Sequence, residues 1–245
     1  SPFMSYGTTV CLTTNIHRTV MSSSEASPMQ WNNHAVLLLE MGRPEDAKLL
    51  FKQALKTLGI EEDRIVKRYA PVRNDMDPPP PPKSAFTGWS IPLHSCFIDG
   101  VFVYCRAVSV HPIFHGSLFE LYAAAIMFNL GLTQHILALQ DGSSGHYNKS
   151  RLFYDYAMNL LQQDTSTTFS PEKDVLRTLL FNNSGHIFYS AYMDSEAAAQ
   201  CFTAVCSLIM DAERSDEDES SIDQVDVTGL LSNVMFQMAN TAPAA

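Results

Sequence analysis

The chain has 245 residues, of which 46% are hydrophobic and 17% are charged, and its formal net charge is −10. This length can bury a sizeable core in one large domain or two small ones. The acidic balance argues against a nucleic-acid partner, because phosphate binding needs a basic face. No apolar run reaches the roughly 20 residues of a transmembrane helix. Five irregularly spaced cysteines do not suggest a disulfide framework. We expect a soluble protein, intracellular or organellar rather than secreted, in an unknown compartment.

Residues 1–28 form an N-terminal arm rich in Ser and Thr, in which the first acidic residue is Glu25. Low acidity is typical of a processed targeting segment, but only Arg18 supplies positive charge. A poorly packed arm is therefore the preferred interpretation, with a removed targeting segment as the alternative.

Residues 29–70 predict a pair of amphipathic helices joined by a turn at residues 41–44. Glu45 and Asp46 stand at the start of the second helix, where the helix dipole favours negative charge. Large and small apolar residues recur at helical spacing. They are Trp31, Ala35 and Leu38 on the first helix, and Ala47, Phe51 and Ala54 on the second.

These six residues, together with Gly42 in the turn, resemble a tetratricopeptide repeat. Two positions depart from that family's pattern: His34-Ala35 stands for its usual Leu-Gly, and Gly59 stands for its closing Pro. The resemblance implies a mostly α fold, a TPR-like array of antiparallel helix hairpins. One such pair cannot bury its apolar face alone, so we expect about three units and a closing helix.

Residues 71–116 are expected to form a linker and an insertion into the array. Pro78 to Pro82 predict polyproline II, either as a stiff spacer or as a ligand for an aromatic-lined groove, and we favour the spacer. Asp99-Gly100 between two apolar runs predicts a β-hairpin with strands near residues 93–98 and 101–109.

Residues 117–210 predict the second and third helix pairs. A long helix over residues 118–140 contains Gly131, and residues 141–145 predict a flexible loop. Pro171 opens the third pair. The small and aromatic residues assigned to the packing positions of these two pairs are Ser150, Tyr154, Ala157, Gly185, Ala197, Cys201 and Ala204.

The C-terminal part begins with an acidic stretch, residues 211–226, which we expect to be a solvated loop. Ser215 precedes Asp216, Glu217 and Asp218, a pattern that resembles acid-directed kinase sites. Residues 227–245 are expected to hold a closing helix, over Leu230 to Met238, and a tail.

Four asparagines, Asn33, Asn129, Asn183 and Asn233, occupy the same register in four helical segments. In the resembled fold, the residue before this register and the one three after it face a concave groove, and others lie one turn further on. Here the groove residues are Asn32, Val36, Phe128, Leu132, His135, Asn182, His186 and Tyr189. Asparagine can donate to and accept from an extended peptide backbone, and the aromatic rings can act as anchors.

We therefore expect a non-enzymatic scaffold or adaptor that binds a protein or peptide segment, either alone or within a larger assembly, with no catalytic residue, metal or cofactor. One rival is a zinc-dependent or thiol enzyme built around residues 94–115. Its candidate ligands are His94, Cys96, Cys105, His111 and His115. A third possibility is a structural subunit whose groove is filled by its own arm or hairpin.

Overall fold

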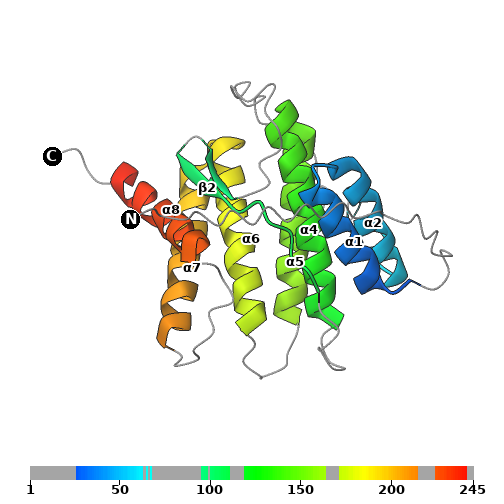
Figure 1. Cartoon of the computed structure of the whole chain (residues 1–245). Helices are drawn as coiled ribbons and strands as arrows, with labels where there is room; N and C mark the ends of the chain where they lie inside the picture. Colours follow the sequence, from blue (N-terminus) through cyan, green and yellow to red (C-terminus); the bar gives the residue numbers. More distant parts are fainter. Residues whose placement is uncertain are drawn as a thin grey trace, which may run out of the picture.

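A computed structural model describes residues 26–62, 65, 67, 95–98, 100–110, 119–163, 171–214 and 224–241. This part of the protein is mostly helical, with one small antiparallel sheet (Figure 1). Its elements are α1 (Pro28–Glu40), α2 (Pro44–Thr57), β1 (Cys96–Ile98), β2 (Val101–Val103), α4 (Phe119–Asp141), α5 (Ser144–Gln163), α6 (Pro171–Ser190), α7 (Ser195–Arg214) and α8 (Gln224–Thr241).

Several features predicted from the sequence lie outside the described residues. They are the first 25 residues of the N-terminal arm, the Pro78–Pro82 run, the candidate ligands His94, His111 and His115, and Ser215 with the acidic residues 216–219.

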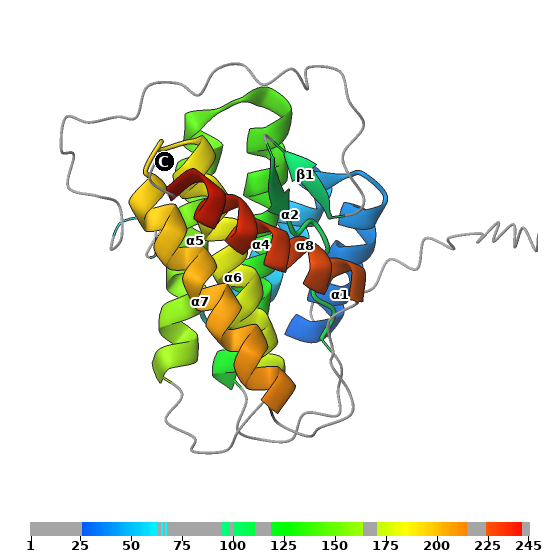
Figure 2. The ribbon, with the colours of Figure 1, turned by 90° about the vertical axis from the view of Figure 1, so that its left-hand side faces the viewer.

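The helices pack in sequence order as a row of pairs. α1 packs on α2, α4 on α5 and α6 on α7, while α2 also contacts α4 and α5 contacts α6. The single helix α8 lies obliquely against α7 at the end of the row (Figure 2). The hairpin contacts α6 and α8 through β2.

The first helix pair begins where the sequence offers capping groups. Ser27 and Gln30 form a capping box at the start of α1, since each side chain accepts a hydrogen bond from the other residue's amide. Pro44 opens α2 at a position where the missing amide N–H costs nothing. Gly42 lies in the turn with φ of 72°, a conformation that L side chains rarely adopt.

The hairpin is shorter than the sequence predicted. Phe97 pairs with Phe102, and the ladder covers only three residues on each strand. Residues 104–109, expected to continue the second strand, are outside the sheet. The reason is that asparagine side chains, not a neighbouring strand, bind the backbone there.

Two predicted loops are also shorter than expected. α4 ends at Asp141 and α5 begins at Ser144, so only residues 142–143 lie between the two helices, in a tight turn. The Asp141 side chain accepts a hydrogen bond from the Ser143 amide (2.8 Å), which stabilises this turn. The acidic stretch 211–226 is helical at both ends, because α7 continues to Arg214 and α8 starts at Gln224.

The central helix α4 is buried on almost every side. Among the described helices it alone has the length and hydropathy of a candidate membrane span, but 94% of its apolar window is buried inside the protein. Its apolar composition is thus explained by its position between α2, α5 and α6.

Small residues allow the helices of each pair to approach closely. In the first pair, Ala35, Ala47, Phe51 and Ala54 are completely buried, while Trp31 and Leu38 are partly buried. In the second pair, the Tyr154 ring packs against Gly131, where a Cβ atom would lie 2.7 Å from it. Ala157 is completely buried beside it.

The register predicted for the third pair is wrong by one residue. Ala197, Cys201 and Ala204 are only half-buried, whereas Ala198, Phe202 and Val205 are buried. The Phe202 ring packs against Gly185, where a Cβ atom would lie 2.6 Å from it. The larger ring therefore occupies the position that we had assigned to Cys201.

Candidate functional site: the asparagine face

Four asparagines bind the chain's own residues 101–110, which we call the inner segment. Each one accepts a hydrogen bond from the amide N–H of one residue in this segment and donates one to the carbonyl of the same residue. The pairs are Asn33 with Val110 (2.9 and 2.8 Å), Asn129 with Val108 (2.7 and 2.8 Å), Asn183 with Tyr104 (3.0 and 2.9 Å) and Asn233 with Phe102 (2.6 and 2.8 Å). We call the surface that carries these four residues the asparagine face.

The inner segment crosses the helices in the reverse of their order in the chain. Phe102 is bound by α8, Tyr104 by α6, Val108 by α4 and Val110 by α1. Figure 1 shows the segment running from the hairpin beside α8 across α6 and α4 towards α1. The bound residues all have the same parity, as expected for an extended chain whose alternate backbone groups point to one side.

The four asparagines and the backbone hydrogen bonds that they make are called the asparagine ladder below. Asn32 and Asn182 connect neighbouring asparagines of this ladder. Asn32 donates to the Val108 carbonyl (3.2 Å) and accepts from Asn129 (2.9 Å). Asn182 donates to the Phe102 carbonyl (3.1 Å) and accepts from Asn233 (2.7 Å). Both side chains are completely buried, so these bonds satisfy polar groups that have no access to water.

The inner segment also contributes apolar side chains to the core. Val101 and Val103 are completely buried, and Phe102 is 3% exposed. The Phe102 ring lies against Gly229 of α8, where any Cβ atom would collide with it. The Tyr104 ring lies 6.5 Å from that of Phe128.

The structure places the other predicted groove residues mostly in the interior. Val36, Phe128, Leu132, His135 and His186 are buried, and Tyr189 is half-buried with its ring 5.5 Å from that of Phe236. The Phe128 ring stacks on Tyr154 at 5.7 Å.

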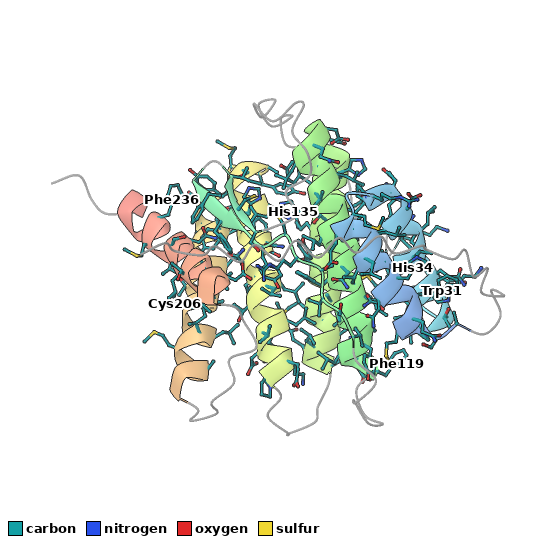
Figure 3. All side chains as sticks on the ribbon, in the orientation of Figure 1. Trp31, His34, Phe119, His135, Cys206 and Phe236 are labelled. Carbon is teal, nitrogen blue, oxygen red and sulfur yellow. The ribbon has the colours of Figure 1, made fainter. Side chains whose placement is uncertain are left out.

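A buried polar network joins α4, α5 and α6. His135 Nε2 lies 2.9 Å from His186 Nδ1, the Tyr154 hydroxyl lies 3.4 Å from His135 Nδ1, and Asn183 donates to that hydroxyl (3.3 Å). His135 lies between α4 and α6 (Figure 3). Burial lowers the pKa of His186 to about 3. Burial and the neighbouring His186 lower the pKa of His135 well below its usual value. Both rings are therefore neutral at pH 7.

Two thiols lie close together on the hairpin. Cys96 is opposite Val103 in the β ladder, and Cys105 lies two residues after Val103, just beyond the end of β2. A hydrogen bond between the two thiols lowers the pKa of Cys96, and the same bond together with burial raises that of Cys105. Within the described residues, no group of three His, Cys, Asp or Glu side chains could hold a metal ion.

Sequence reasoning found the asparagine register but assigned the groove contacts partly to other positions. The four register asparagines themselves bind the inner segment in two directions each, whereas we had used them only to align the helices. The available signal was the doublet at Asn32-Asn33 and again at Asn182-Asn183, on a helix face that is otherwise apolar. No sequence signal identified the residues that these side chains would bind.

A second residue missed from the sequence is Asp226 of α8, which we had placed in the acidic loop. Its side chain is 3% exposed, and its carboxylate lies 3.3 Å from the Arg106 guanidinium.

Comparisons of the chain with protein-family models, with curated proteins and with solved structures find no match.

Proposed function

We propose that this protein is a non-enzymatic interaction scaffold of the TPR-like, helical-repeat kind, which holds an extended protein segment along its asparagine face. One observation carries the proposal: four asparagines, one on the first helix of each pair and one on α8, each bind both backbone groups of one residue in an extended segment. This is how a peptide is held through its main chain, because a side-chain amide offers a donor and an acceptor together.

Main-chain binding suits a partner that is extended when bound. The backbone N–H and C=O groups are the same in every residue except proline, so the ladder grips any extended chain that fits. Asn32 and Asn182 hold the neighbouring asparagine side chains in place, which limits the rotamer freedom lost when a segment binds. Affinity then comes from preformed hydrogen bonds, with aromatic side chains as anchors.

The inner segment acts as an internal ligand that an external partner has to displace. A tethered segment has an effective concentration on the order of millimolar, so a free peptide at micromolar concentration competes poorly with it. Weakening the inner segment without changing the asparagines should therefore increase the apparent affinity for an external peptide.

A second candidate function is that of a structural subunit in which the inner segment stays in place permanently. The burial of Val101, Phe102 and Val103 in the core favours this role, because releasing them would expose apolar area. A partner would then bind another surface of the protein.

Proline substitutions in the inner segment separate these two functions. Val108→Pro removes the N–H that donates to Asn129, whereas Ser109→Pro changes a neighbouring exposed residue whose N–H donates to none of the asparagines. The probe is a fluorescent peptide that copies residues 100–110, with serine in place of Cys105. Its binding is followed by fluorescence anisotropy.

For an interaction scaffold, the peptide should bind Val108→Pro about tenfold more tightly than Ser109→Pro or the unchanged chain. Circular dichroism verifies that both variants keep their helices. Equal affinities for the two variants, or no binding to a folded Val108→Pro chain, would exclude peptide exchange at this face and favour the structural subunit.

A further inference from the structure

The asparagine ladder passes over one residue of the inner segment, and a charged pair takes its place. Residues 102, 104, 108 and 110 are bound by asparagines, and residue 106 has the same parity. Arg106 instead meets Asp226, with 3.3 Å between guanidinium and carboxylate. The ladder therefore changes from main-chain to side-chain contacts at this position.

The burial of Asp226 makes position 106 of the segment selective for a basic side chain. The carboxylate is 3% exposed, so an ionised Asp226 without a cation beside it would lose its hydration without compensation. The Arg106 side chain is 41% exposed, and one of its guanidinium nitrogens contacts the buried carboxylate. The basic group thus comes from the bound segment and the acidic group from the face.

Two further contacts, close to the Arg106–Asp226 pair, involve side chains of the inner segment. Gly229 lies one helical turn after Asp226 on α8 and leaves room for the Phe102 ring. Phe128 of α4 lies beside the Tyr104 ring. These contacts favour large planar side chains two and four residues before the basic one.

We infer that the asparagine face selects an extended segment with a basic residue in the middle, preceded by aromatic residues at its alternate positions and followed by β-branched ones, and that Asp226 determines this selectivity. The inference rests on the proposed function, since it uses the inner segment as the template for an external partner. An acidic segment would place like charges together and be rejected.

The test compares four peptides on the Val108→Pro chain. They copy residues 100–110, with serine for Cys105, and carry Arg, Lys, Ala or Glu at the position of Arg106. Removing the cation beside the buried Asp226 carboxylate should weaken binding about tenfold or more, so Ala should bind more weakly than Arg, and Glu more weakly still. A peptide with Ala at the position of the exposed Ser109 is the matched control and should bind like the parent.

The same series on a Val108→Pro/Asp226→Asn chain assigns the effect to Asp226. Asparagine keeps the size of the side chain and removes its charge, so the difference between the Arg and Ala peptides should fall below about threefold. If Arg and Ala peptides bind the Val108→Pro chain equally, the inference is wrong while main-chain binding stands. If no peptide binds that chain in its folded form, the proposed function itself fails. Should Asp226→Asn not fold, the four-peptide series still decides.

Discussion

His135 and His186 face each other across the boundary between α4 and α6, with 2.9 Å between the nearest ring nitrogens. Neither ring is exposed to solvent. One ring has to donate and the other to accept, so a proton added to the accepting nitrogen would place two donors face to face. The join between the second and third helix pairs therefore depends on both histidines remaining neutral.

The first prediction is that the free energy of unfolding decreases as the pH is lowered below about 6.5. The pKa of His186 is lowered to about 3 in the folded protein, whereas an unfolded chain binds its proton near pH 6.5. Between these values the unfolded state holds more protons, so the free energy of unfolding decreases as pH falls through this window. His186 should cost about 2 kcal/mol at pH 5 relative to pH 7.5, and His135 should lower the stability in the same direction.

Urea unfolding at pH 7.5 and pH 5 measures this loss. Replacing both histidines by glutamine should flatten the pH dependence, whatever it does to stability at pH 7.5. His34→Ala is the control, because His34 is exposed on α1. A pH dependence that survives in the double variant would assign the effect to other groups.

The second prediction concerns the ladder. Asn183→Ala removes both hydrogen bonds to the Tyr104 backbone and leaves its N–H and C=O without these partners. Each of these partly buried hydrogen bonds contributes about 0.5–1.5 kcal/mol, so the free energy of unfolding should fall by about 1–3 kcal/mol. The control Gln200→Ala changes an exposed residue of α7 and should have little effect in the same denaturant titration.

The third prediction uses two helical glycines with opposite surroundings. Gly131→Ala would place a Cβ atom 2.7 Å from the Tyr154 ring and should destabilise the protein by about 1–3 kcal/mol. Gly145→Ala meets only the Ser143 hydroxyl at 3.5 Å and should be neutral or stabilising, because alanine favours helix more than glycine. The melting temperature should therefore fall for Gly131→Ala and stay the same or rise for Gly145→Ala. A stabilising Gly131→Ala would refute the close packing of α4 on α5.

The fourth prediction concerns three of the described cysteines, namely Cys96, Cys105 and Cys201. Burial raises the pKa of Cys201 to about 11, and Cys105 is buried with its pKa raised by the Cys96 thiol. Only thiolates react readily with iodoacetamide, so at pH 8 Cys96 should be alkylated before Cys105 and Cys201. Peptide mass spectrometry over time measures the order. Urea-unfolded protein is the control, in which the three rates should converge.

The helices could be predicted from the sequence because the patterns that indicate them are local. The spacing of Ala47, Phe51 and Ala54, and proline at residues 44 and 171, lie within one or two helical turns. The third pair shows the limit of such patterns. Cys201 and Phe202 both fit a helical repeat, and only the space at Gly185 decides which of them faces it.

The path of the inner segment could not be predicted for a different reason. Asn233 binds a residue 131 positions earlier in the chain, and Asn33 binds one 77 positions later. Nothing in the local sequence specifies such pairs, since any extended backbone satisfies an asparagine equally well. The same holds for Asp226, whose acidic surroundings in the sequence suggested a solvated loop.

The reversed path of the inner segment has a consequence for how the chain acquires its structure. Arrays of helix pairs ordinarily assemble from neighbour to neighbour, so one end can form or melt alone. Here Phe102 leaves the ribosome 131 residues before Asn233. At typical rates of synthesis that interval is on the order of ten seconds. During this time the strand is bound at most by its early partners, and its apolar residues are open to chaperones or to another chain. Once Asn233 arrives, one strand connects α8 to α1, and we expect the array to melt in a single transition.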